Sequence, residues 1–129
     1  MNETKFNSQI CTSVEQSQRL LDLGLKPETA DMYIFDDEVY IGKPNIDDTL
    51  AWSLHRLIEM LPQKLHFDEY VNTYYYLTIK PFCLTKVLYR QDGGSWLYGS
   101  ESSNLFDAII DVIEYIIIGE HFNKEYLKQ

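Results

Sequence analysis

The feature that most constrains this chain is an apolar run near its C-terminus, from Leu105 to Ile118. Ser103 or Asn104 can cap a helix there, and Gly119 follows the run. The run contains only one polar stripe, formed by the acidic residues Asp107, Asp111 and Glu114. A helix that is apolar on most sides is central to a core or covered by a partner. The run is too short and too charged to span a membrane, so we expect no membrane association.

A second strong pattern is the alternation of side chains from Tyr70 to Lys80, which predicts a long strand. One face would carry Val71, Thr73, Tyr75, Leu77 and Ile79, and the other Tyr74, Tyr76, Thr78 and Lys80. Cys83 to Arg90 and Ser95 to Tyr98 are expected to form two further strands, with a turn at Asp92-Gly93-Gly94. The segment therefore predicts a three-stranded antiparallel meander.

The N-terminal half predicts a helix followed by a hairpin. Thr12 and Glu15 suggest a capping box for a helix that continues to Leu23, and Gly24 is placed to end it. A single helical turn is expected at residues 27–30. Two short β-rich runs, at residues 32–35 and 39–41, then predict a hairpin. Its tip is acidic: Asp36, Asp37 and Glu38.

Asp47 or Asp48 is expected to cap a second helix that continues to Leu61, where Pro62 stops it. Trp52 would then lie on the polar side of this helix. The apolar side would carry Leu50, Leu54, Leu57, Ile58 and Leu61.

The predicted order is α-ββ-α-βββ-α, an α+β fold with three helices and an antiparallel sheet made of the hairpin and the meander. The 129 residues are expected to form a single domain, with fraying at residues 1–10 and 124–129.

The chain has 20 acidic and 11 basic residues, which gives a net charge of −9. Such a field repels phosphate backbones, so we expect no nucleic acid partner. The acids concentrate between Glu28 and Asp48 and between Glu101 and Glu125. A solvated surface is the simplest interpretation, and a docking face for a basic partner is the alternative. The two cysteines, Cys11 and Cys83, form no metal-binding motif, which favours free thiols and a cytoplasmic location.

The sequence shows no catalytic or metal-binding constellation, and we expect no cofactor. His55 and Glu59 are one helical turn apart but have no evident third ligand. Ser100 lacks the second glycine of a nucleophile elbow. Residues 20–30 imitate a helix-turn-helix motif, but the following residues are β-rich and the flanks are acidic.

The surplus of aromatic residues has the most functional promise, because the chain contains ten tyrosines. Tyr74 and Tyr76 are expected to point away from the core face of their strand, and Trp52 and Trp96 to lie near a surface. Such residues anchor protein interfaces when they are exposed. Helices or a dimer mate covering both faces of the sheet is the alternative. The candidate partner-binding residues are Asp36, Asp37, Glu38, Tyr74, Tyr76 and Trp96.

Three stretches carry a resemblance to a known family. They are CTSVEQS at residues 11–17 with LLDLGL at 20–25 and TADM at 29–32, then AWSL at 51–54, and finally YG at 98–99 with Asn104 and DA at 107–108. Together they resemble a family of small uncharacterised proteins of prophages and mobile elements in gut-dwelling bacteria. In that family a proline commonly follows the asparagine, where this chain has Leu105. The family has no established activity, so the resemblance implies a genetic context alone.

Three functional hypotheses follow. The first is a non-enzymatic accessory or host-modulating protein of a mobile element that acts by protein–protein contact. The second is a small acidic inhibitor or immunity protein that covers a basic active site. The third is an enzyme whose site forms across a dimer. The surplus of apolar surface on the last helix also predicts a homodimer, or a surface that another protein completes.

Overall fold

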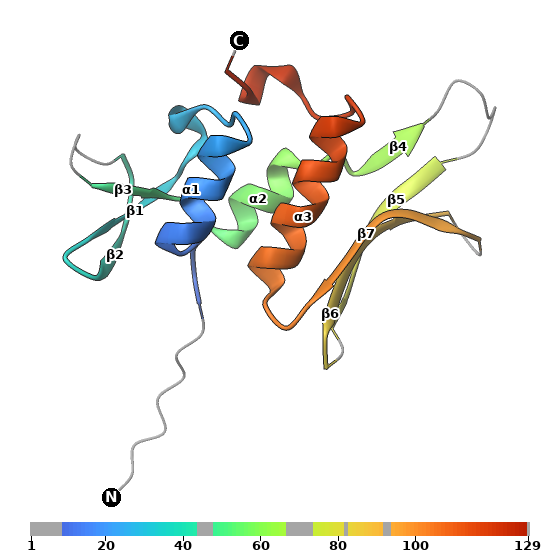
Figure 1. Ribbon diagram of the computed structural model, residues 1–129, viewed down its shortest axis with the longest axis horizontal. Coiled ribbons are helices and arrows are strands. Elements are labelled where there is room, and N and C mark those ends of the chain that lie inside the picture. Colours follow the sequence, from blue (N-terminus) through green and yellow to red (C-terminus); the bar gives the residue numbers. More distant parts are fainter. Residues whose placement is uncertain (1–8, 44–47, 67–73, 82, 92–93, 129) are drawn as a thin grey trace, which may run out of the picture.

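The C-terminal helix α3, Leu105–Ile118, lies at the centre of the molecule. We describe the chain from a computed structural model, which defines residues 9–43, 48–66, 74–81, 83–91 and 94–128. Figure 1 shows the helices between a small sheet and a larger sheet. Of the two caps that the sequence allowed, Ser103 and Asn104, Asn104 is the one used, and it accepts a hydrogen bond from the backbone N–H of Asp107.

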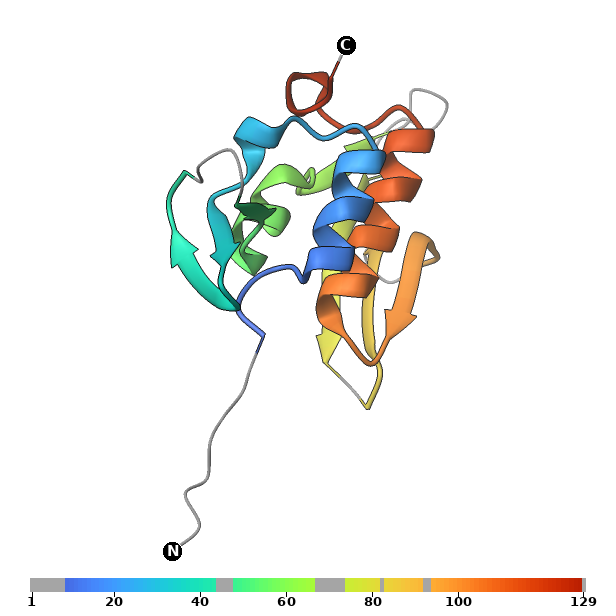
Figure 2. The same ribbon diagram turned by 60° about the vertical axis from the view of Figure 1, so that its left-hand side comes forward.

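Both sides of α3 are covered by the chain itself. Strands β6, Thr85–Arg90, and β7, Trp96–Ser102, pack on one side. Helices α1, Val14–Asp22, and α2, Leu54–Met60, pack on the other (Figures 1 and 2). Seven residues of α3 are buried: Phe106, Ala108, Ile109, Ile110, Val112, Ile113 and Ile116. These seven residues are buried within the chain itself, whereas Tyr115 is 40% exposed and Ile118 is 74% exposed.

Two antiparallel sheets confirm the predicted α+β class. The smaller sheet has the order β2-β1-β3, with β1 at Met32–Phe35, β2 at Glu38–Ile41 and β3 at Thr49–Ala51. The larger sheet has the order β4-β5-β6-β7, with β4 at Lys64–His66 and β5 at Tyr74–Pro81. The predicted hairpin and meander are therefore in separate sheets, and each gains one short strand.

The ends of several predicted strands differ in the structure. Strand β6 begins at Thr85 rather than at Cys83, and β7 continues past Tyr98 to Ser102. Tyr98 has a φ of 53°, and the pairing of β6 with β7 shifts register beside it. This bulge disrupts the alternation on which the prediction relied. Residues 70–73, and residues 92–93 of the predicted turn, lie outside the described part of the chain.

Helix α1 begins one residue later than its predicted cap implies. Ser13, not Thr12, is the N-cap, and Gln16, not Glu15, completes the capping box. Thr12 is buried instead, and its hydroxyl oxygen accepts from the backbone N–H of Trp52 at 3.0 Å. The predicted end of α1 is confirmed, because Gly24 has a φ of +102°.

The predicted second helix was too long at its N-terminus. Ser53 caps α2, and Asp48 does not, because residues 49–51 form β3 and pair with β1. Asp47 lies outside the described residues. The Asp31 carboxylate accepts from the Ser53 backbone N–H at 2.8 Å and from its hydroxyl. A contact between residues distant in sequence therefore fixes the start of this helix.

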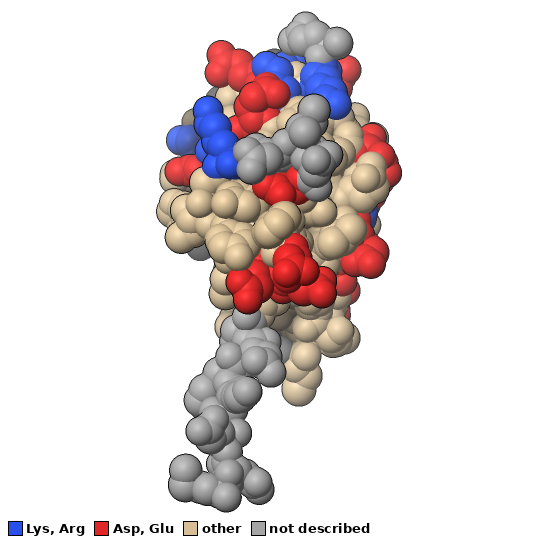
Figure 3. Space-filling model, turned by 90° about the vertical axis from the view of Figure 1, so that its left-hand side faces the viewer, with Lys and Arg blue, Asp and Glu red and all other residues tan. Residues whose placement is uncertain are grey.

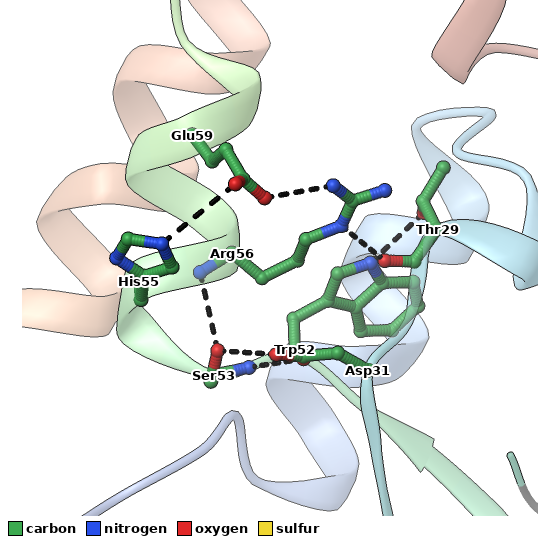
Figure 4. A network of polar contacts seen from close by, with 7 residues as sticks. All are labelled: Thr29, Asp31, Trp52, Ser53, His55, Arg56 and Glu59. Carbon is green, nitrogen blue, oxygen red and sulfur yellow. Dashed lines mark hydrogen bonds and ion pairs between the residues drawn. The ribbon is translucent and has the colours of Figure 1, made fainter. Parts of the chain in front are cut away.

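Trp52 is fully buried, which corrects the prediction that it lies near a surface. Its indole N–H donates to the Thr29 hydroxyl at 2.9 Å, and Arg56 Nε donates to the Thr29 carbonyl at 2.8 Å (Figure 4). This network joins α2 to the short 3₁₀ helix η1, Pro27–Thr29. The polar end of the ring is satisfied, so the side chain can occupy the core.

The C-terminal segment is held against the turn after α1. The backbone N–H of Lys26 donates to the Tyr126 carbonyl at 2.8 Å, and that of Lys128 donates to the Gly24 carbonyl at 2.8 Å. A second 3₁₀ helix, η2, spans Lys124–Tyr126. These main-chain bonds connect the C-terminal segment to the turn after α1, where the sequence suggested a frayed end.

The burial of Trp52 gives a matched pair of stability tests. Replacing Trp52 with phenylalanine removes a buried hydrogen bond and part of the core volume, so unfolding should become easier by about 1–3 kcal/mol. The same substitution at the exposed Trp96 should change the free energy of unfolding by no more than about 0.5 kcal/mol. Urea unfolding followed by circular dichroism measures both. Equal effects of the two substitutions would contradict the assignment of Trp52 to the core.

Candidate functional site

The described residues do not bring together three or more His, Cys, Asp or Glu side chains that could hold a metal ion. His55 and Glu59 are 3.7 Å apart on the surface of α2. Both cysteines are free. Burial raises the pKa of the Cys11 thiol, with a smaller contribution from Asp31, whereas Cys83 is exposed. The chemistry of these groups does not indicate a site, so the surfaces of the sheets become the candidates.

The outer face of the larger sheet carries a row of cationic and aromatic residues that crosses all four strands. Strand register places Lys64 opposite Tyr76, Tyr76 opposite Arg90, and Arg90 opposite Trp96. Directly opposed residues of antiparallel strands share a face. Tyr76 is 46% exposed and Trp96 is 61% exposed. The structure therefore brings together two of the predicted aromatic residues.

The inner face of the same sheet is committed to the core. Leu65, Val87 and Tyr89 are buried, and Tyr75 and Leu77 pack against the same cluster as α3. The Tyr89 hydroxyl donates to the Pro62 carbonyl at 2.6 Å, and burial raises its pKa far above the ordinary value. Of the two faces of this sheet, the outer one is therefore the face left for a partner.

Tyr74 extends the row toward β4. Its ring stacks on His66 with 4.8 Å between centroids, and the ammonium of Lys64 lies 4.9 Å from the Tyr74 ring centre. Tyr74 is half-buried by these contacts. It supports the exposed row but offers less contact area than Tyr76 or Trp96.

A shallow hollow of about 390 Å³ lies beside Trp96 on the outer face. Its floor includes Leu88, which is mostly buried. The remaining residues that line it are Lys80, Lys86, Arg90, Gly94, Trp96, Gly99, Ser100 and Glu101. Lys86 is 3.8 Å from the Glu101 carboxylate. The hollow therefore combines an apolar floor with a cationic border.

Gly99 determines where the Trp96 ring lies. A Cβ atom at residue 99 would be 2.8 Å from Cζ3 of Trp96 and 3.3 Å from Cβ of Leu88. The indole thus rests directly over the glycine, an approach that any larger residue would prevent. The ring is held in place although most of its surface remains exposed.

We define the outer face by Lys64, Tyr74, Tyr76, Lys80, Lys86, Leu88, Arg90, Trp96, Gly99 and Glu101. Four of these residues are cations and one is an acid, so the described part of this face is positive although the chain carries −9. This local charge is not evident from the sequence, because the cations are scattered between residues 64 and 90. The available signal was Lys80, which alternates with Tyr74 and Tyr76 on one side of the strand.

The acidic hairpin tip lies at the other end of the molecule (Figure 1). Asp36 and Asp37 have φ values of 52° and 61°, which form a tight turn between β1 and β2. Glu38 begins β2 and accepts a hydrogen bond from the Tyr40 hydroxyl at 2.9 Å. Figure 3 shows acidic groups distributed over this side of the molecule. The tip is exposed and separate from the outer face.

The acidic stripe of α3 is not a free docking surface. The Arg19 guanidinium contacts Asp111 at 2.6 Å and Glu114 at 3.0 Å. Gln16 Nε2 donates to Asp107 at 2.7 Å. Burial lowers the Arg19 pKa, but the hydrogen bonds to the two carboxylates outweigh it and raise the pKa above its usual value. The stripe therefore joins α1 to α3.

No protein-family model, curated protein or solved structure matches this chain. Among the described residues, no helix combines the length and the apolar character needed to cross a membrane.

Trp96 can report the local charge of the outer face. Iodide should quench its fluorescence more than caesium does, by at least about two-fold after normalisation to free N-acetyltryptophanamide, because Arg90 lies opposite Trp96 and two lysines line the same hollow. Trp52 is buried, so the ionic quenchers reach it little and the change in quenching reports Trp96. Arg90→Gln should reduce the ratio, and added salt should reduce it further. A preference for caesium would show that the net charge of −9 governs this site.

Proposed function

We propose that this chain is a non-catalytic binding protein that acts by protein–protein contact through the outer face of the larger sheet. The exposed row of Tyr76, Arg90 and Trp96 is the observation that carries this proposal. Tyrosine, tryptophan and arginine are the residue types that contribute most to binding at protein interfaces. Here they lie side by side on a rigid element.

The exposure of this row is unusual for a sheet of this kind. An antiparallel sheet with one face in a core usually presents polar residues on its other face. Trp96 instead holds a large ring in the open, and the packing of that ring over Gly99 limits its movement. A side chain that is already ordered loses less entropy when a partner binds. This preorganisation supports a role in binding.

The charge of the outer face favours a different partner over a second copy. Two copies that met face to face would bring Lys64, Lys80 and Arg90 of each copy toward the same cations of the other. Like charges brought together at an interface oppose association. A homodimer would therefore use another surface.

We further propose that the protein serves a mobile element as an accessory or host-modulating factor. The resemblance to proteins of prophages and mobile elements, at residues 11–17, 20–25, 29–32, 51–54, 98–99, 104 and 107–108, supports this context. The contact surface gives the proposed role a physical basis, because an accessory protein acts on a host through what it binds.

The acidic-inhibitor hypothesis now rests on the hairpin tip alone, because the stripe on α3 is engaged by Arg19 and Gln16. The tip retains exposed carboxylates at Asp36 and Asp37 beside Phe35, which is 57% exposed. It is a second candidate surface for a basic partner.

Affinity capture with two double variants distinguishes the surfaces. Tyr76→Ser with Trp96→Ser should lose the partners that the unmodified protein captures from a gut-bacterial lysate. Asp36→Asn with Asp37→Asn should retain them, because asparagine tolerates the positive φ of this turn. Circular dichroism would verify that both variants fold. The opposite pattern would reject the outer face and favour the inhibitor hypothesis.

A further inference from the structure

We infer that the outer face binds an acidic segment of a partner protein, with carboxylates at Lys80, Lys86 and Arg90 and an apolar side chain against Trp96. This inference rests on the proposed function and specifies the chemistry of the partner. It combines three features of the face: an opposed pair of lysines, an arginine whose two cross-strand neighbours are aromatic, and the apolar surface of Trp96 and Leu88.

The opposed lysines are the first argument. Lys80 and Lys86 are direct cross-strand partners in β5 and β6. Like charges at directly opposite positions destabilise a sheet. Glu101 lies opposite Lys86 and 3.8 Å from it, but the described residues provide no ion pair for Lys80. The fold gains nothing from this repulsion, whereas an anionic ligand between the two ammonium groups would relieve it.

Arg90 is the second argument. It lies between Tyr76 and Trp96 in the row, and the described residues give its guanidinium no carboxylate partner. A guanidinium binds a carboxylate with two parallel hydrogen bonds and also stacks on aromatic rings. An acidic side chain that reached Arg90 would therefore meet a bidentate donor whose cross-strand neighbours are Tyr76 and Trp96.

The apolar floor is the third argument. Leu88 is mostly buried beneath the hollow, and the Trp96 ring lies beside it over Gly99. An ion alone would leave the Trp96 ring, which is 61% exposed, in contact with water. A segment that alternates acidic and apolar side chains would satisfy both the cations and the floor.

The charge of the whole chain decides between an acidic protein segment and a single-stranded nucleic acid. A nucleic acid strand carries a phosphate at every nucleotide and would extend beyond the cationic face. It would then meet a surface even more acidic than the net charge of −9 implies. A short peptide is confined to the face, where salt screens charges more than about 8 Å away.

The test uses a short synthetic peptide in which glutamate and phenylalanine alternate. Titration of the full chain should change the Trp96 fluorescence and show saturable binding that weakens with salt. Lys80→Gln, Lys86→Gln and Arg90→Gln should each weaken binding by about tenfold, the effect of losing one charge-assisted hydrogen bond. Lys43→Gln is the matched control: it also removes one positive charge, but Lys43 follows β2 in the smaller sheet, so binding should be unchanged.

Two controls examine the peptide and the ring. A peptide with glutamine in place of glutamate should bind at least about tenfold more weakly. Gly99→Ala keeps every charge but displaces the Trp96 ring, because its Cβ would lie 2.8 Å from that ring. This substitution should therefore weaken binding of the phenylalanine-containing peptide but not binding of a peptide of glutamate and serine.

The outcomes separate this inference from the proposed function. Equal binding of the glutamate and glutamine peptides would overturn the acidic specificity, while loss of both in Trp96→Ser would still support a contact surface. Tighter binding of single-stranded oligothymidine than of the acidic peptide would also overturn the inference. No response to the acidic peptide at millimolar concentration would overturn it as well. The capture experiment with Tyr76→Ser and Trp96→Ser independently decides whether the face binds a partner.

Discussion

The burial of α3 on both sides is the constraint on which the rest of this structure depends. A helix with a single polar stripe must be enclosed, and the chain encloses it with one face of a four-stranded sheet and with two helices. The inner face of the sheet is buried by this packing, and all three helices lie on the inner side of the sheet. The outer face is left open as a consequence. Its aromatic residues are therefore available to a partner because of the way in which the core is built.

The polar stripe of α3 shows why charge counts alone mislead. Six acids between residues 101 and 125 suggested an acidic surface, yet two of them bind Arg19 and one binds Gln16. These contacts connect residues about ninety positions apart. They align α1 against α3 and satisfy polar groups at the border of the core. The stripe is thus part of the packing, and the inhibitor hypothesis loses its main surface.

Local signals predicted the parts of the fold that depend on neighbouring residues. The cap at Asn104, the glycine that ends α1 and the hairpin around Asp36 and Asp37 all act within a few positions. The predicted start of α2 was wrong because a hydrogen bond from Ser53 to the distant Asp31 fixes it. The predicted position of Trp52 was wrong for a similar reason, since its indole binds the distant Thr29. Alternation predicted the outward direction of Tyr76. Its position beside Arg90 and Trp96 depends on strand register, which alternation alone does not define.

The positive outer face limits what a net charge can exclude. A charge of −9 describes the field far from the molecule, whereas a bound segment experiences the charges within about one Debye length. On the outer face these are four cations and one acid among the described residues. The acidic remainder still matters, because it would repel a long polyanion that extended beyond the face, whereas a short ligand could stay within it. Net charge therefore supports the expectation that nucleic acid does not bind, and local charge supports the acidic protein segment that we propose.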